Sequence, residues 1–289
     1  MMQDDPMPAM APVPPAARQR SGRLAQEGAK ASAIAVLSTV LFFGGGAWLV
    51  ASSPNWPKVR AQFFSASDFR ASFPDVLDGF WLSIQLFAYC TVLTAVLALV
   101  VAVMRSFRGP AFFPIRLLAI VFTDVFRGIP LILLVLLLGF GLPALRIEGL
   151  PNSAKFWGVI ALTLSYSAYT AEIYRSGIDA VPESQRSSAR ALGLTQWQAL
   201  RFAILPQAVR NVVPALMNTV VSLQKDVALI SILGVREAVK EAQIYTASTF
   251  NYTSYMVATL MFLALSVPLT RLVDWYTARD RRQRSQAQL

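Results

Sequence analysis

The sequence predicts an all-α integral membrane protein with six transmembrane helices. Of its 289 residues, 55% are hydrophobic and only 15% are charged, unlike the composition of an ordinary soluble domain. Long apolar runs alternate with short polar segments throughout the chain. The arginines gather in the polar segments that fall on one side of the membrane when six runs are counted.

Each of the six runs is long enough for a helix to cross the bilayer's hydrocarbon core, which is about 30 Å thick. The runs cover about Ser32–Ala51, Phe80–Met104, Leu117–Leu142, Phe156–Tyr174, Val209–Leu233 and Tyr252–Val273.

Arginine-rich segments predict the orientation, because such segments stay on the cytoplasmic side. They contain Arg105, Arg108 and Arg116, the block from Arg175 to Arg210, and Arg279, Arg281, Arg282 and Arg284. Both termini are therefore expected to be cytoplasmic. Five or seven spans would break this agreement.

Composition then divides the chain. Residues 1–30 are rich in Pro, Ala and polar residues and are predicted to be a disordered basic tail. Residues 31–78 are expected to form a first helix and an outer loop, residues 79–275 a transmembrane domain with a cytoplasmic loop at 176–208, and residues 276–289 a basic tail.

Several functions are excluded or disfavoured. Histidine is absent, which excludes His-based catalysis and His metal ligands, and the single Cys90 cannot form an internal disulfide. No G-x-x-x-x-G-K-[ST] phosphate loop occurs. The net charge of +10 is explained by membrane loops, not by nucleic-acid binding. We therefore expect no enzyme activity, catalytic residue, metal or cofactor in this chain.

The loop at 176–208 carries signals for a rigid hairpin. Gly193 is placed to end a first short helix. Thr195 and Gln198 have the spacing of a capping box for a second helix, on which Trp197, Leu200 and Ile204 are expected to share a face. Pro206 is expected to end or kink that helix. The loop is either a docking surface for a soluble partner or a simple amphipathic connector.

This loop resembles the EAA loop of bacterial ABC-importer permeases, in which Glu-Ala-Ala is followed by Gly and then by Ile-x-Leu-Pro. Here the matching residues are Ser187-Ser188-Ala189, Gly193 and Leu205-Pro206, with Ile204 displaced by one position. Serines thus replace the glutamate and the first alanine. Glu183 is a candidate to compensate.

The chain is more closely similar to the polar amino-acid uptake subfamily of these permeases, over about residues 78–275. Four ordered motifs carry this resemblance: Phe126-Arg127-Gly128-Ile129-Pro130-Leu131, the segment from Ala168 to Ile178, Ala191-Leu192-Gly193-Leu194 with Leu205-Pro206-Gln207-Ala208-Val209-Arg210, and Lys225-Asp226-Val227-Ala228-Leu229.

The resemblance implies a type I ABC importer permease with a five-helix core, to which the first helix is an addition, in the bacterial cytoplasmic (inner) membrane. Its implied partners are ABC ATPase subunits that bind ATP and Mg, an extracytoplasmic solute-binding protein, membrane lipid and a second permease subunit, either the same or a different chain. Polar amino acids are the implied substrate. The residues expected to couple the permease to the ATPase are Glu183, Ser187, Ser188, Ala189, Gly193, Leu205 and Pro206.

Charges inside the fifth run need a reason, because each costs about 2.5–3.5 kcal/mol at the bilayer centre. Gln224, Lys225 and Asp226 are candidates for the substrate path, with Lys225 meeting a carboxylate and Asp226 an ammonium group. Pairing with each other or with other helices is the alternative. Adjacent helical residues diverge by about 100°, so Lys225 and Asp226 are not expected to face one point.

Two further pairs have a spacing of three residues, which favours contact on one helix face. We predict that these pairs are gate residues or structural ion pairs near the cytoplasmic side. They are Asp124 with Arg127 and Glu172 with Arg175.

The main alternative function is an ABC permease for another class of solute. A proton- or sodium-coupled carrier is less favoured, because no convincing internal repeat is found. A membrane-anchored scaffold would not need Lys225 and Asp226 inside a span.

Overall fold

The computed structural model describes residues 15–107 and 109–286, and every regular element among them is a helix. These elements are α1 (Pro15–Ala51), α2 (Trp56–Phe63), α3 (Ala66–Ser106), η1 (Pro110–Phe112), α4 (Phe113–Gly128), α5 (Leu131–Leu136), η2 (Leu137–Gly141), α6 (Leu142–Ala144), α7 (Ala154–Asp179), α8 (Glu183–Ala191), α9 (Gln196–Gln198), η3 (Ala199–Ile204), α10 (Leu205–Asp226), η4 (Val227–Leu233), α11 (Ala238–Thr249) and α12 (Thr253–Gln286). Residues 1–60 form one unit and residues 61–289 another.

The first unit consists mainly of α1. Its segment Ser32–Ala51 is apolar enough to cross a membrane, and none of its side chains is buried. The helix begins at Pro15, so residues 15–30, which were expected to be disordered, are helical. Strong helix formers such as Ala, Arg, Gln and Leu fill this stretch, and proline suits a first helical position. Residues 1–14 of the expected tail, Arg108 and residues 287–289 lie outside the described part.

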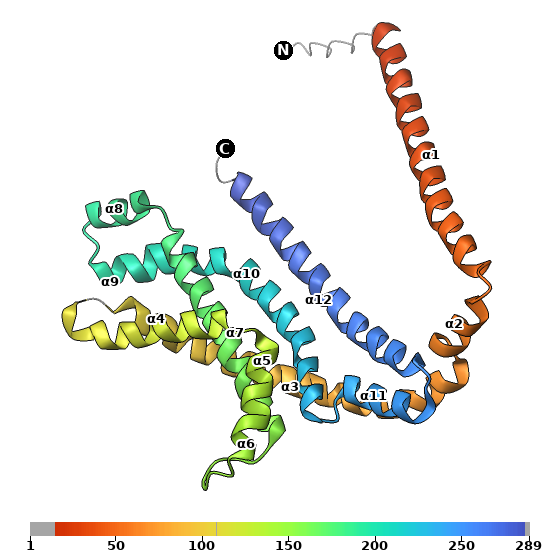
Figure 1. Cartoon of the computed structure of the whole chain (residues 1–289). Helices are drawn as coiled ribbons and strands as arrows, with labels where there is room; N and C mark the ends of the chain where they lie inside the picture. Colours follow the sequence, from red (N-terminus) through yellow and green to blue (C-terminus); the bar gives the residue numbers. More distant parts are fainter. Residues whose placement is uncertain (1–14, 108, 287–289) are drawn as a thin grey trace, which may run out of the picture. The chain divides into compact units, whose positions relative to one another are not determined.

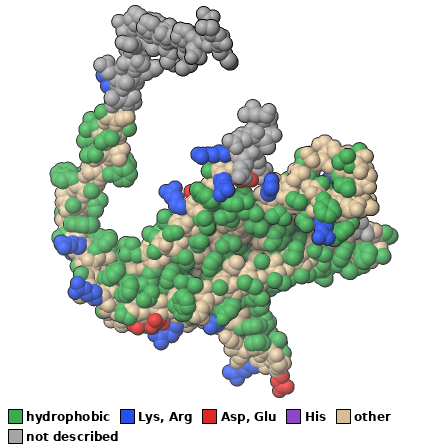
Figure 2. Space-filling view, turned by 180° about the vertical axis from the view of Figure 1, so that it is seen from behind, with side chains coloured by type: hydrophobic (Ala, Val, Ile, Leu, Met, Phe, Trp, Pro, Cys, Tyr) green, Lys and Arg blue, Asp and Glu red, His purple; other side chains and the backbone are tan. Residues whose placement is uncertain are grey.

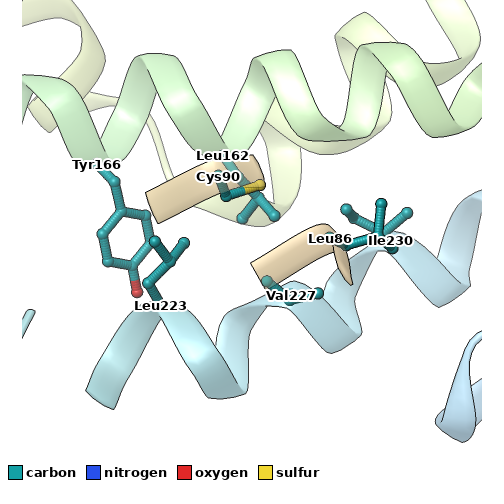
Figure 3. Packing of buried hydrophobic residues seen from close by; sticks show 7 residues of the cluster. All are labelled: Leu86, Cys90, Leu162, Tyr166, Leu223, Val227 and Ile230. Carbon is teal, nitrogen blue, oxygen red and sulfur yellow. The ribbon is translucent and has the colours of Figure 1, made fainter. Parts of the chain in front are cut away.

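Three segments build the centre of the second unit. One buried cluster joins them (Figure 3). It contains Leu86 and Cys90 of α3, Leu162 and Tyr166 of α7, and three residues of α10 and η4. The residues from α10 and η4 are Leu223, Val227 and Ile230. Cys90 therefore serves as a small buried hydrophobic residue.

Four of the described helices are long and apolar enough to cross a membrane, or five when one bent pair is counted as a single span. The bent pair replaces the straight third span that was predicted: the segments Pro110–Gly128 and Leu131–Ala144 meet at 104°. Pro130 causes the break, because it lacks an N–H group and forces the preceding Ile129 into an extended conformation. The predicted fourth span corresponds to α7, a long helix with many buried side chains.

The end of α2 is fastened to the start of α12. The Asn251 side chain donates to the Ala61 carbonyl (2.9 Å), and the Tyr252 N–H donates to the Gln62 carbonyl (2.8 Å). The rings of Phe63 and Tyr252 stack with centroids 5.4 Å apart. This clasp fixes where the chain enters α3 relative to the last helix.

A second junction joins α3 to α11 through a buried carboxyl. Glu237 is fully buried, its Oε2 lies 3.0 Å from the Ser83 hydroxyl, and its Oε1 accepts from the Lys240 N–H (3.0 Å). Gly79 allows this approach, because a Cβ there would lie 2.7 Å from the Glu237 carbonyl carbon. Burial raises the pKa of Glu237 to about 7.

The outer surface of the second unit suits a hydrocarbon environment. In the view of Figure 2 hydrophobic side chains cover most of this unit, and charged side chains gather toward its borders. Figure 1 shows α7 running from the end of α6 to α8, and α9 leading into α10.

Candidate functional site

A cavity of about 700 Å³, lined in part by polar side chains, lies where the bend between α4 and α5 meets α7 and α10. Gly128 and Pro130 at the bend form one wall. The other walls carry hydroxyl, amide and charged groups, namely Arg127, Tyr166, Tyr169, Glu172, Asn218 and Asp226. Such a concentration of polar groups within an apolar helical domain indicates a site that handles a polar solute.

One end of the cavity is marked by Asp226. The Tyr166 hydroxyl on α7 donates to its Oδ2 at 2.6 Å. This bond joins α7 to the last residue of α10, and it orients the carboxylate while leaving its other oxygen for a ligand.

The other end is marked by Glu172, whose partner Arg105 ties three helices together. Arg105 of α3 donates to Glu172 (2.7 Å) and to Thr123 of α4 (3.1 Å). Arg175 also pairs with Glu172 and, one turn further along α7, with Asp179 (2.5 Å). The predicted Glu172–Arg175 pair is therefore present, as part of a larger ion-pair network.

Arg127 and Asp124 do not pair with each other, contrary to the prediction from their spacing. The Arg127 guanidinium lies over the Tyr169 ring, 5.6 Å from its centroid, and the Tyr169 hydroxyl donates to the Arg127 carbonyl (3.2 Å). The aromatic face of α7 thus draws Arg127 toward the cavity, and Asp124 stays exposed on α4.

The three polar residues predicted for the substrate path take three different positions. Asp226 lines the cavity, whereas Lys225 lines a separate groove between α10 and α12. Gln224 is buried, and its Oε1 accepts from Ser266 of α12 (2.5 Å). The divergence of Lys225 and Asp226 follows from the helical period, which continues to the end of α10.

The hairpin between α7 and α10 forms where the sequence predicts it. Gly193 has a φ of +80°, a backbone conformation that favours glycine, and it ends the turn after α8. Thr195 and Gln198 form the predicted capping box. Arg186 anchors α8 by donating to the Ile178 carbonyl at the end of α7 (2.8 Å).

The second arm of the hairpin differs from its prediction in two respects. Pro206 does not end the helix, because the π-helical segment η3 leads directly into α10, with Pro206 in its first turn. A wider π turn accommodates the missing N–H of proline. Leu200 and Ile204 pack against Val181, whereas Trp197 is exposed.

The exposed face of the hairpin contains most of the residues predicted to couple to an ATPase. Ser187 and Ser188 are exposed, whereas Ala189 is buried. Glu183 is paired with two arginines of its own helix, Arg190 (3.1 Å) and Arg186 (3.7 Å). Large apolar side chains project from the hairpin at Leu192, Trp197, Phe202 and Leu205. A soluble surface loop rarely exposes so many, which indicates a docking surface.

The hairpin and the cavity are connected by close contact between α7 and α10. At Gly177 an added Cβ would lie 2.0 Å from the Val212 Cγ1 and 3.0 Å from the Ala208 carbonyl oxygen. The two helices that flank the hairpin are therefore in direct backbone-to-side-chain contact, and they also form two walls of the cavity.

Sequence reasoning missed Tyr166, Tyr169, Asn218, Arg105 and Thr123 as site residues. Tyr166 and Asp226 are 60 positions apart, and no local spacing relates them. Arg105 was seen only as a marker of a basic loop. The one signal available was that Arg105 and the acidic Glu172 each lie at the cytoplasmic end of a predicted span.

The comparison with protein families agrees with this geometry. Residues 95–282 match the family described as binding-protein-dependent transport system inner membrane component. The chain belongs to this family. The match includes the cavity, the hairpin and the last span, and it leaves α1 and α2 outside.

The chain matches individual relatives over most of their length. The arginine transport system permease protein ArtQ of Bacillus subtilis (strain 168) is 32% identical over 212 residues, which are 70% of this chain and 92% of the relative. The probable glutamine ABC transporter permease protein GlnM of the same organism is 32% identical over 211 residues, 72% of this chain and 94% of the relative.

Solved structures show the same fold. A chain from an amino acid ABC transporter with histidines superimposes with a TM-score of 0.65 and 31% identity, over 71% of this chain and 94% of that chain. A chain of the inward-facing MetNI methionine ABC transporter gives a TM-score of 0.57 at 17% identity, over 71% and 96%, and supports the fold alone.

Proposed function

We propose that this protein is the permease subunit of an ATP-driven importer for polar amino acids, with the cavity as part of the translocation path. The observation that carries the proposal is the arrangement of α7 and α10, which form walls of the cavity and also flank the hairpin. A displacement imposed on the hairpin is thereby passed to Asp226 and Glu172 through rigid helices in contact at Gly177.

The cavity's chemistry suits a zwitterionic solute. Asp226 offers a carboxylate to an ammonium group, Arg127 offers a guanidinium to a carboxylate, and Asn218 offers an amide. The relatives named for arginine and glutamine transport support the same class of solute. Asp226 takes the substrate-path role in this proposal, Gln224 a packing role, and Lys225 a role outside the cavity.

The hairpin is the proposed seat for the ATPase, which binds ATP and Mg itself. In this assignment the hairpin and both termini are cytoplasmic, in the bacterial inner membrane, and an extracytoplasmic solute-binding protein delivers the substrate. The proposal keeps the coupling roles of the residues expected from the sequence, namely Glu183, Ser187, Ser188, Ala189, Gly193, Leu205 and Pro206. Ala189 and Gly193 act by shaping the hairpin, because one is buried and the other holds the turn.

Retention of the ATPase tests this proposal. The tagged chain is purified from its own cells, and its ATPase is expected to be retained. Leu192 is 81% exposed on the hairpin. The Leu192→Asp variant should retain at least about tenfold less ATPase than the unmodified chain. Leu145→Asp is the matched control, because Leu145 is 64% exposed near α6, away from the hairpin.

Two results would contradict the proposal. One is a chain that never retains an ATPase and whose uptake survives ATP depletion, which would favour an ion-coupled carrier. The other is an equal loss of the ATPase from both variants, which would mean that the hairpin is not the docking surface.

A further inference from the structure

Glu172 lines the cavity, yet both of its carboxylate oxygens already face guanidinium groups. Its Oε2 accepts from Arg105 of α3 (2.7 Å), and its Oε1 accepts from the Arg175 Nε, one turn further along α7 (3.2 Å). The Arg105 and Glu172 side chains are only 18% and 23% exposed. Water therefore screens this pair weakly, and removing one partner would leave an uncompensated charge at the edge of the cavity.

Arg105 reaches Glu172 from outside the cavity. It lies in the last turn of α3, and it does not line the cavity itself. Its guanidinium also donates to the hydroxyl of Thr123 on α4 (3.1 Å), a side chain that is fully buried. This second bond holds the guanidinium against Glu172. Arg105 can therefore influence a solute in the cavity only through the charge and position of Glu172.

The charges in and around the cavity cancel. Three line it, and three more belong to the ion-pair network of Glu172, so that positive and negative charges are equal in number among the described residues: Arg127, Glu172 and Asp226, then Arg105, Arg175 and Asp179. An amino acid without net charge leaves this balance intact. A cationic side chain would find no free carboxylate, because Asp226 is taken by the ammonium group and Glu172 by its arginines.

We propose that Arg105 determines the charge class of the solute: by neutralising Glu172, it makes the cavity select amino acids with neutral polar side chains over those with cationic ones. The inference rests on the proposed function, and it adds the charge of the solute's side chain and the residue that sets this preference. Without Arg105, the cavity would carry a net negative charge and would attract a cationic side chain to Glu172.

Equilibrium binding of radiolabelled glutamine and arginine tests the preference. The purified complex of the permease and its ATPase is used without the solute-binding protein, so that the cavity alone selects. The unmodified complex should bind glutamine more tightly than arginine. In Arg105→Gln the ratio of the two affinities should move toward arginine by about tenfold or more, as expected for one weakly screened charge.

Two single variants control for the substitution itself. Arg105→Lys keeps the positive charge and should recover most of the preference for glutamine. Arg70→Gln makes the same change on the same helix, at an exposed side chain near the opposite end of α3, and should leave the ratio unchanged.

A double variant distinguishes a role of charge from a role in packing. Glu172→Gln alone removes the negative charge and should move the ratio further toward glutamine. The double variant Arg105→Gln/Glu172→Gln has balanced charges again, and its ratio should return to within a few-fold of that of the unmodified complex. If Arg105 only supported the packing of α3, the second substitution would not restore the ratio.

Three results would overturn the inference: a preference of the unmodified complex for arginine, equal ratios for Arg105→Gln and Arg70→Gln, or a double variant that keeps the ratio of Arg105→Gln. ATP-driven uptake of both amino acids is measured with the same unmodified complex. Uptake of either one together with any of the three results would refute the inference alone. Binding of neither amino acid, together with a failure of ATP-driven uptake, would refute the proposed function.

Discussion

The hairpin and the cavity are held together by different kinds of interaction. The hairpin depends on backbone conformation and neighbouring residues: the positive φ of Gly193, the capping box of Thr195 and Gln198, and ion pairs within α8. The cavity depends on contacts between distant helices, such as Tyr166 with Asp226 and Arg105 with Glu172. In the proposed function the hairpin transmits displacement and is locally rigid, whereas the cavity changes shape and is closed by separable side-chain contacts.

The largest effect is expected where these two regions join. Gly177→Ala would place its Cβ 2.0 Å from the Val212 Cγ1 and force α7 away from α10. Overpacking of this kind costs about 1–3 kcal/mol, and both folding yield and uptake should fall. Gly141→Ala is the control, because its Cβ would meet the nearest atom at an ordinary 3.9 Å. Thermal melting of the purified protein checks the prediction, and equal melting temperatures for the two variants would contradict it.

The next largest effect is expected from a variant that changes the hairpin and leaves the cavity unchanged. Gly193→Val has open space for its side chain but cannot easily adopt a φ of +80°. We expect uptake to fall about tenfold while the ATPase continues to hydrolyse ATP. Gly193→Asn should retain coupling, because asparagine tolerates the left-handed region. Paired measurements of hydrolysis and uptake check this. Normal uptake by the valine variant would show that the turn is not part of the coupling element.

A smaller effect is expected from the cavity alone. Asp226→Asn keeps the size of the side chain and an acceptor for Tyr166 but removes the charge. Uptake should fall several-fold, with ATPase retention unchanged, because the hairpin is not altered. Tyr166→Phe leaves the charge and should have a weaker effect. If Asp226→Asn instead released the ATPase, the two regions would not be separable as described.

The smallest effect on uptake is expected at the α3–α11 junction, through pH. The pKa of Glu237 is raised from 4.5 to about 7 by burial, so the protonated form is favoured in the folded protein. This contribution to stability is complete below about pH 4.5 and is lost as the pH rises through about 7. The melting temperature should therefore fall by a few degrees between about pH 6 and about pH 8.

Glu237→Gln should remove that pH dependence. Glu241, whose charge also raises the pKa of Glu237, is paired with Arg236 (2.7 Å). In Glu241→Gln the pH dependence should remain, with a lower midpoint. An unchanged pH profile in the Glu237→Gln protein would assign the dependence to another group.

The sequence was sufficient for features that depend on neighbouring residues. Apolar runs predicted the membrane helices, and glycine and capping signals predicted the hairpin. It was insufficient where a helix break, or a contact between residues far apart in the sequence, determines the structure. Pro130 was visible, yet hydropathy gave no sign that it bends the chain by 104° and forms a cavity wall. Spacing alone suggested that Arg127 pairs with Asp124, whereas Tyr169 of α7 takes that place.

Reconstituted transport tests the central claim most directly. The purified chain is placed in liposomes with its co-purified ATPase and the solute-binding protein, and uptake of radiolabelled arginine and glutamine is followed with and without ATP on the ATPase side. The account predicts that uptake of at least one of them depends on both ATP and the ATPase, and is lost with Gly193→Val. Uptake driven by a proton or sodium gradient without ATP would contradict it.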